Sequence, residues 1–511
     1  MLKVSHKNIA LIPVFAGIFF AADDQTVVVT ILPQIMSDLM VEVTDLDRAM
    51  WTVTGYLLGY VSVMPVMGKV SDIYGRKFIY IASMSVFILG SIGTGLTNSL
   101  AFLETYVYHD SAYIRNSASY ILESSTSLNW VIGTRLVQAI GAGALIPVTI
   151  AIITDSYSGK ERFIPMGMTG ACAEAGAVIG PLWGGIVTQF FSWQWVFWLN
   201  IPIGLLVIIG IAFLVPNTKP IKHKMDYLGS LIIVAAICLI TFGCAQSGTN
   251  TPLLATFIFS GLVFLVGYYV FSKTHNNPVL PIDIFKNIQF VAANVLHLFY
   301  GASLIITLVT IPLMVNTVLS GTSLEGGLIL LRMTIAIPIG AIVGGWLSKN
   351  FDLRMAGCAG LIFCTISLFF MSLWTESIND PAMSLHLLIA GFGFGLVIAP
   401  ITTSAMNNVN SEDQGAAAGI ISASRFLGMT LGIAAVAAWG AQKFQDLLLG
   451  IDITVTELGK VGGNESVFEN QFTQVGLTLF HNFFIVGAIL CLIGLMPCIL
   501  LVRRKRQLNI T

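Results

Sequence analysis

Long apolar stretches recur along the whole of this 511-residue chain, and they constrain its fold more than any other feature. A helix needs about 20 mostly apolar residues to cross the hydrocarbon core of a bilayer. Inside lipid the backbone must satisfy its own hydrogen bonds, which leaves helices or closed barrels. Stretches of this length are typical of helices, so the sequence predicts an all-α integral membrane protein with fourteen spans. They lie near residues 9–32, 48–67, 78–97, 130–152, 163–187, 194–215, 228–246, 253–271, 289–314, 325–347, 355–373, 384–405, 415–440 and 478–502.

The charged residues support this class and predict an orientation. Only 10% of the residues are charged, whereas soluble domains contain about 25%. Lys and Arg gather on the cytoplasmic side of membranes. If both termini are cytoplasmic, the inner segments hold 18 of the 25 Lys and Arg residues, the outer segments hold 4 and the spans hold 3. We therefore expect a multi-pass protein of the plasma membrane, with residues 98–129 and 442–477 outside.

Several function classes receive no support from the sequence. The net charge of −1 gives no reason to expect a nucleic-acid partner. There is no G-x-x-x-x-G-K-[ST] motif, so ATP is not expected to drive the protein directly. The seven Cys residues all fall in apolar spans, which argues against a disulfide framework. No cluster of Cys and His predicts a metal or cofactor, and we expect no enzymatic activity.

A charged decapeptide, GKVSDIYGRK at Gly68–Lys77, joins the second and third spans and is predicted to form a loop. GWLSKNFDLR at Gly345–Arg354 is a weaker copy that joins two later spans and lacks the Asp and the second Gly. A feature that recurs once at long range indicates two repeated halves, a common plan for secondary transporters. Polar connectors then predict an N-terminal bundle at residues 1–215, two intervening helices at 216–273 and a C-terminal bundle at 274–511.

The fifth span contains GAVIGPLWGG, in which Gly176, Gly180 and Gly184 are spaced four residues apart on one helical face. Small residues at this spacing allow two membrane helices to approach closely. Pro181 removes a backbone hydrogen bond and favours a kink. The pattern predicts a tight, bendable helix contact suited to a conformational change, or ordinary close packing.

The decapeptide resembles the loop between helices 2 and 3 of the major facilitator superfamily through Gly68, Asp72, Gly75 and Arg76. In that family the Asp bridges the second helix to the second bundle and favours the outward-open state. The neighbouring bases Lys69, Arg76 and Lys77 leave a solvated local ion pair as the alternative, worth about 0–1 kcal/mol.

Further segments resemble the fourteen-helix drug:proton antiporter family in the same order along the chain. GAVIGPLWGG resembles the antiporter motif, and WQWVFWLNIPIG follows it as in that family. DDQTVVVTILP carries Asp24, RLVQAIGAG carries Arg135 and AGIISASRFLG carries Arg425. The resemblance implies two six-helix bundles plus two extra helices, and proton-coupled export of small amphipathic compounds that are often cationic.

Charged residues inside the spans are candidate functional residues, because each costs about 2.5–3.5 kcal/mol or more at a membrane's centre. Asp24 and Arg135 lie roughly 12 Å and 10 Å from the outer ends of their spans at 1.5 Å per residue, so a pair between them is feasible. Glu174 is deeper and fits Arg135 less well. The full set is Asp23, Asp24, Arg135, Glu174, Arg332 and Arg425.

The identity of the proton carrier stays open between neighbouring carboxylates. Asp23 and Asp24 point about 100° apart on a helix, and Asp23 shares its face with Thr26 and Thr30. Periodicity therefore favours Asp23, while the family motif favours Asp24. Glu174 departs from the family pattern and is the third candidate.

We expect export of a small amphipathic molecule, with protons and the bilayer as the other partners. The three intramembrane Arg residues also suit an anion, so the alternatives are efflux or exchange of an endogenous metabolite, an organic anion or a lipid. A membrane receptor that transports nothing is the third hypothesis. The single intramembrane His297 is expected to be packed and hydrogen-bonded rather than a proton relay.

Overall fold

The computed structural model describes residues 6–39, 41, 46–97, 128–217, 225–245, 251–275, 278–319, 321, 323–378, 380–407, 409–449 and 465–501. Every long element in these ranges is an α-helix, and fourteen helices are long and apolar enough to cross a membrane. The long helices are α1 (His6–Asp38), α3 (Trp51–Tyr74), α4 (Arg76–Gly95), α7 (Leu128–Ser156), α8 (Phe163–Phe190), α9 (Gln194–Leu214), α10 (Tyr227–Ala245), α11 (Thr251–Thr274), α12 (Ile288–Thr317), α13 (Ser323–Asn350), α14 (Leu353–Met371), α15 (Asp380–Met406), α16 (Gln414–Leu449) and α18 (Glu465–Ile499). The short elements are α2 (Leu46–Ala49), η2 (Gly159–Arg162), η3 (Ile282–Lys286) and η4 (Ser411–Asp413).

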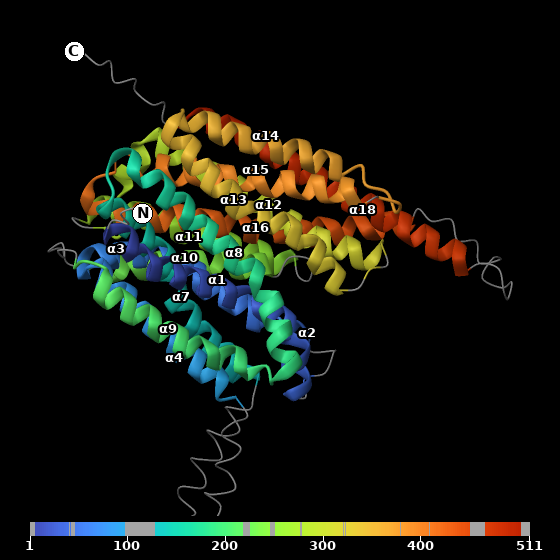
Figure 1. Ribbon diagram of the computed structural model, residues 1–511, viewed down its shortest axis with the longest axis horizontal. Helices are drawn as coiled ribbons and strands as arrows, with labels where there is room; N and C mark the ends of the chain where they lie inside the picture. The colour runs from blue at the N-terminus through green and yellow to red at the C-terminus, as the bar shows by residue number, and fades with distance from the viewer. Residues whose placement is uncertain are drawn as a thin grey trace, which may run out of the picture.

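The long helices pack as two groups. The N-terminal bundle comprises α1, α3, α4, α7, α8 and α9, and the C-terminal bundle comprises α12 to α16 and α18. The two bundles contact each other mainly where α3 meets α16 and where α8 meets α13. Figure 1 shows them close together at the left, where α1 begins and α18 ends, and diverging toward the right. We call these the terminal end and the opposite end.

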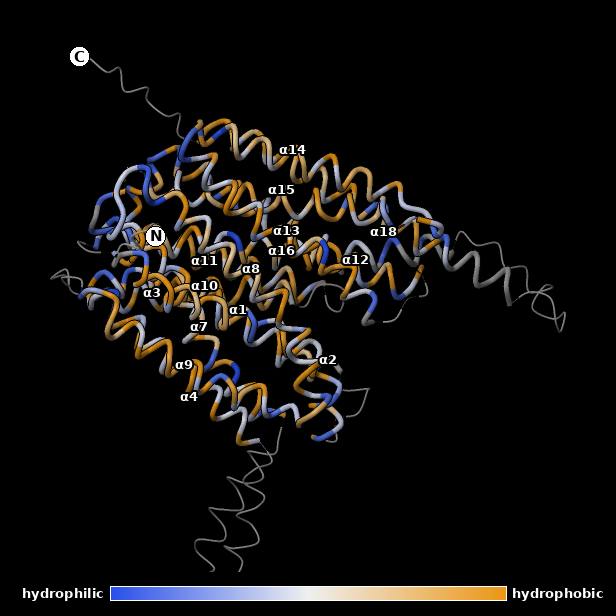
Figure 2. The backbone as a smooth tube through the Cα atoms, viewed as in Figure 1, coloured by the Kyte–Doolittle hydropathy of each residue, from blue (hydrophilic) through white to orange (hydrophobic). Residues whose placement is uncertain are grey.

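Helices α10 and α11 lie outside both groups. Helix α10 packs on α3 and also contacts α16. Its Cys238 Sγ lies 3.0 Å from the Ser62 hydroxyl of α3, and its Phe242 ring lies 5.2 Å from the Trp51 ring. Helix α11 packs on α10 and exposes a broad apolar surface that includes Phe259 and Val266. Apolar residues predominate along the long helices (Figure 2), and many large apolar side chains are exposed, as expected for helices that face lipid.

The predicted loop at Gly68–Lys77 is wrong in its local structure. Helix α3 continues to Tyr74 and α4 begins at Arg76, so Gly75 alone separates them. Gly75 has φ of 94°, a conformation that costs glycine little because it has no Cβ. The polar residues of the decapeptide are therefore held on two rigid helix ends.

The predicted outer segment at 442–477 is largely helical at both of its ends. Helix α16 continues to Leu449 and α18 begins at Glu465, so both extend well past the apolar spans. The sequence AQKFQDLLL that ends α16 is rich in good helix formers. Hydropathy marks where a helix can meet lipid and does not mark where the helix ends. Most of the other predicted outer segment, residues 98–127, lies outside the described residues.

Candidate transport site and bundle junction

Asp24 of α1 lies at the centre of a buried polar cluster. Arg135 of α7 forms an ion pair with its Oδ2 atom, and both side chains are fully buried. Gln138 Nε2 and Asn200 Nδ2 donate hydrogen bonds to Oδ1 at 2.9 and 2.8 Å. The Arg135 guanidinium also lies 4.1 Å from the centroid of the Tyr56 ring. A paired and hydrogen-bonded carboxylate avoids most of the cost of a lone buried charge.

The matching depths of Asp24 and Arg135 make a pair feasible, and the structure has this pair. The amides of Gln138 and Asn200 were not singled out. Gln138 follows Arg135 by three residues, which places both on one helical face. Asn200 is the Asn of WQWVFWLNIPIG. A search for polar side chains within one turn of each intramembrane charge would have found Gln138.

Asp23 is buried beside this cluster but has different surroundings. Its side-chain Oδ1 has no hydrogen-bond partner in the described part of the chain. Thr26, predicted to share its face, donates a hydrogen bond to the carbonyl of Ala177 in α8 at 2.8 Å. Thr30 is exposed. The face of α1 that carries Asp23 therefore packs against α8 at Thr26.

The glycine face of α8 is the counterpart of that packing. A Cβ at Gly180 would lie 2.5 Å from the carbonyl oxygen of Asp23, and one at Gly184 would lie 3.1 Å from that of Val27. A Cβ at Gly176 would overlap the carbonyl of Phe19. The close helix contact predicted from these glycines is confirmed, and Pro181 lies within it. Its partner is α1, the helix that carries both Asp residues.

Glu174 and Arg425 connect the two bundles. Glu174 of α8 forms an ion pair with Arg425 of α16, and only 4% and 8% of these residues are exposed. The Arg425 guanidinium lies 5.7 Å from the centroid of the Tyr300 ring. Glu174 therefore pairs with a residue 251 positions away and not with Arg135. A change in the angle between the bundles must alter this contact.

Two other residues singled out in the sequence lie in the C-terminal bundle. Arg332 was expected to be a buried charge, and this is wrong, because a third of its side chain is exposed and it pairs with the exposed Asp380. It lies in the third turn of α13, and helical side chains point back toward the N-terminus. His297 is buried, and its Nδ1 lies 2.8 Å from the carbonyl of Ile421, so the expected hydrogen bond is present.

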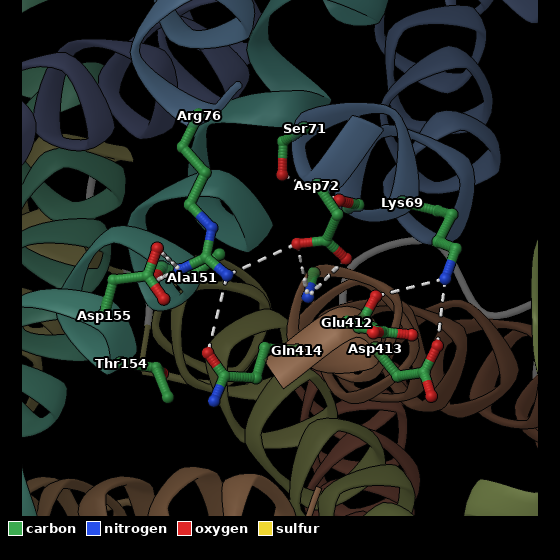
Figure 3. Close-up of polar contacts among 12 residues, drawn as sticks. Lys69, Ser71, Asp72, Arg76, Ala151, Thr154, Asp155, Glu412, Asp413 and Gln414 are labelled. Atoms are coloured by element: carbon green, nitrogen blue, oxygen red, sulfur yellow. Dashed lines mark hydrogen bonds and ion pairs between the residues drawn. The ribbon is translucent and has the colours of Figure 1, made fainter. Parts of the chain in front are cut away.

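Asp72 joins the bundles at the terminal end (Figure 3). Its Oδ2 and Oδ1 atoms accept hydrogen bonds from the backbone N–H of Gly415 at 2.9 and 3.2 Å. Gly415 is the second residue of α16, where backbone N–H groups lack partners within the helix and attract negative charge. The bridge to the second bundle is confirmed. The alternative of a solvated pair is wrong, because only 4% of Asp72 is exposed.

Basic residues surround this bridge (Figure 3). Arg76 Nη2 lies 3.3 Å from Asp72 Oδ1 and 3.4 Å from Gln414 Oε1, and Arg76 also pairs with Asp155 of α7. Lys69 Nζ donates hydrogen bonds to Asp413 Oδ1 at 2.9 Å and to the carbonyl of Glu412 at 3.1 Å. The N-terminal bundle thus accepts hydrogen bonds from the C-terminal bundle at the Asp72 carboxylate and donates hydrogen bonds to it from the cationic groups of Lys69 and Arg76.

Comparisons with known proteins agree with this architecture. The family model described as Major Facilitator Superfamily matches residues 14–433. The triacylglyceride transporter of Mycolicibacterium smegmatis is 29% identical over 517 residues, which cover 96% of this chain and 86% of the relative. The triacylglyceride transporter of Mycobacterium tuberculosis strain H37Rv is 28% identical over 526 residues, which cover 98% and 96%.

Two solved structures share the fold. The human organic anion transporter MFSD10 aligns with a TM-score of 0.58 at 14% identity, over 95% of this chain and 99% of that chain. The proton:xylose symporter XylE aligns with a TM-score of 0.59 at 13% identity, over 94% of each chain. At sequence identities this low, the two structures support the fold of this chain and no specific function.

Proposed function

Since the chain belongs to the major facilitator superfamily, we propose that it is a proton-coupled lipid exporter of the plasma membrane, with both termini cytoplasmic. The observation that carries this proposal is the likeness to triacylglyceride transporters along nearly the whole chain. It favours the lipid among the substrates that the sequence left open. The proposed cargo is a triacylglyceride or a similar neutral lipid.

Asp24 is the proposed proton carrier. Protonation removes its charge and leaves Arg135 buried beside a neutral group. Breaking a buried pair in this way costs about 3–5 kcal/mol, so proton binding favours a conformation in which Arg135 finds another partner or water. Inward movement of one proton yields about 2.3 kcal/mol per 100 mV. An exchanger needs such a link between protonation and conformation.

The proposed conformational change is a rocking of the two bundles. In the conformation described here, Glu174–Arg425 joins them near the middle of α8 and Asp72–Gly415 joins them at the terminal end. An opening at the terminal end would separate the second pair of groups. The glycine face of α8 would keep α1 and α8 together during this motion, because their backbones are in direct contact.

A second candidate is export of small amphipathic cations, which the antiporter-like motifs imply. Asp23 favours it, since its buried Oδ1 has no hydrogen-bond partner among the described residues and could meet a cation. The two candidates differ in whether the cargo carries a charge. That difference can be measured directly.

The test uses the full-length protein in liposomes with an imposed pH gradient. One probe is a triacylglyceride with a fluorescent acyl chain, and the other is the cationic dye ethidium. We expect gradient-dependent movement of the triacylglyceride, and its loss in Asp24→Asn. Asp38→Asn is the matched control, because Asp38 is an acid of the same helix that instead accepts a hydrogen bond from Trp193 Nε1.

The remaining outcomes separate the alternatives. Movement of ethidium alone would replace the lipid by a cationic cargo. Coupled transport in Asp24→Asn, together with its loss in Asp23→Asn, would move the proton to Asp23. If both variants stay coupled, Glu174 becomes the leading carboxylate. No flux of either probe would favour a receptor.

A further inference from the structure

The outer surface of the C-terminal bundle contains a groove of about 340 Å³ between α13, α14 and α15. All of its lining residues are apolar, namely Ala336, Ile339, Phe363, Leu388, Ile389 and Phe392. Ile339, Phe363 and Leu388 are 53%, 40% and 43% exposed, so the groove opens to the surroundings of the bundle. Within a membrane span those surroundings are lipid.

A polar cluster stands at one end of this groove. Arg332 of α13 pairs with Asp380 of α15 and donates a hydrogen bond to the Ser384 hydroxyl at 2.7 Å. Arg332 precedes Ala336 by one helical turn, and Ser384 precedes Leu388 by one turn. One turn is about 5–6 Å along the axis. The cluster therefore lies on the same helix faces as the groove, toward the opposite end of the molecule.

The charges of the cluster are only partly satisfied. Hydrogen bonds of Arg332 to the described residues all come from Nη1, which leaves Nη2 and Nε available. One third of the Arg332 side chain and two thirds of the Asp380 side chain are exposed. A guanidinium has a planar fork of donors that matches phosphate oxygens. Long basic side chains near helix ends also reach toward the interface where lipid headgroups lie.

We propose that the Arg332 cluster and the adjoining groove form a binding site for one membrane phospholipid. The phosphate lies at Arg332, where it replaces part of the contact with Asp380. One acyl chain lies along Ile339 and Phe392. The groove volume is at the lower end of ligand pockets, about 300–1,000 Å³, which suits a single chain. This site is on the outside of the bundle and does not depend on the transported cargo.

The experiment uses the full-length protein in nanodiscs with phosphatidylglycerol that carries a diazirine midway along one acyl chain. Labelled positions are mapped by mass spectrometry. We expect labelling of α14 and α15 in the groove, reduced at least fivefold by Arg332→Gln. Asp380→Asn should increase labelling, because it removes the carboxylate that competes with the phosphate. Ile339→Trp should fill the groove and block labelling, whereas Ile362→Trp, at a 44% exposed position outside the lining, should not.

A diacylglycerol with the same diazirine chains provides the lipid control. Equal labelling by this phosphate-free lipid would overturn the proposal, since the groove would then hold any hydrocarbon. Loss of the labelling in millimolar inorganic phosphate would assign the Arg332 cluster to free phosphate and also overturn the proposal. A similar decrease in Arg332→Gln and Asp380→Asn would show that the ion pair only holds α13 against α15. If Arg332→Gln does not fold, the diacylglycerol and Ile339→Trp arms still decide.

Discussion

Gly68 and Gly345 occupy corresponding places in the two halves of the chain, and each lies against the start of a helix in the other bundle. A Cβ at Gly68 would overlap the carbonyl of Gly415, the second residue of α16. A Cβ at Gly345 would lie 2.9 Å from the carbonyl of Phe163, the first residue of α8. Each copy of the decapeptide thus places its helix, α3 or α13, against a helix of the other bundle. Both contacts are between backbones, and a side chain at the glycine would prevent them.

The two junctions differ in charge. At the first, Asp72 accepts hydrogen bonds from the start of α16. The corresponding residue of the second copy is Lys349, and the neighbouring Ser348 hydroxyl has no hydrogen-bond partner in the described ranges. The close approach is common to both halves, whereas a carboxylate that accepts from a helix start belongs to the first. At the second, the Arg162 guanidinium, just before α8, instead donates a hydrogen bond to Asn407 Oδ1, just after α15. Opening at the terminal end would therefore break a carboxylate bridge at the first junction and a guanidinium–amide hydrogen bond at the second.

The largest expected effect is at Gly68. Gly68→Leu places a side chain where two backbones touch, and overpacking costs about 1–3 kcal/mol or more. A shift of about 3 kcal/mol changes the ratio of two conformations by more than a hundredfold. We expect normal insertion but nearly complete loss of lipid transport, measured in liposomes after size-exclusion chromatography. Normal flux in a well-folded Gly68→Leu protein would contradict the backbone contact.

Asp72→Asn should have the next largest effect. Hydrogen bonds to charged groups contribute about 1.5–3 kcal/mol, and Asn retains one acceptor, so part of the bridge remains. We expect faster hydrogen exchange at the Gly415 amide and a several-fold lower turnover, with little change in cargo affinity. Asp155→Asn is the control, because it removes another partner of Arg76 without touching Gly415. If the Gly415 amide exchanged at the same rate in the wild type, Asp72→Asn and Asp155→Asn, then Asp72 would not hold the start of α16.

Gly345→Ala should have a smaller effect. The nearest atom, the backbone carbonyl oxygen of Phe163, is 2.9 Å from the added carbon, so the two helices must separate, but by less than at Gly68, where the added carbon would overlap the carbonyl of Gly415. We expect about a twofold to fivefold loss of flux, consistent with a cost near 1 kcal/mol. Gly327→Ala in the same helix is the control, since its added carbon would meet nothing within 4 Å. A loss as complete as in Gly68→Leu would show that the two junctions are equally tight.

The fourteen spans were predictable because burial in lipid requires long apolar segments, and α10 at Tyr227–Ala245 matches the predicted 228–246 closely. The Asp24–Arg135 pair was predictable because depth follows from residue count within a span. Glu174–Arg425 was not, since it depends on how two bundles dock. The rotation of α9 that turns Asn200 toward Asp24 is set by packing that no single span reveals. The helical structure of Gly68–Tyr74 was not predicted, because a charged sequence with a glycine at Gly75 has the composition of a loop.

The smallest effect is expected from transferring the charge to the second junction. Lys349→Asp places a carboxylate at the position that corresponds to Asp72, next to the start of α8. One difference limits its gain. Lys349 is half-buried, so water competes for the new carboxylate, whereas only 4% of Asp72 is exposed. We expect a new bridge worth at most about 0.5–1 kcal/mol and a decrease in turnover of less than about fivefold, measured together with hydrogen exchange at residues 163–166.

Slower exchange at residues 163–166 would show that the second junction accepts the same chemistry as the first. Unchanged exchange with unchanged turnover would show that the charged bridge needs the buried geometry of Asp72, and that the two halves differ in more than one residue.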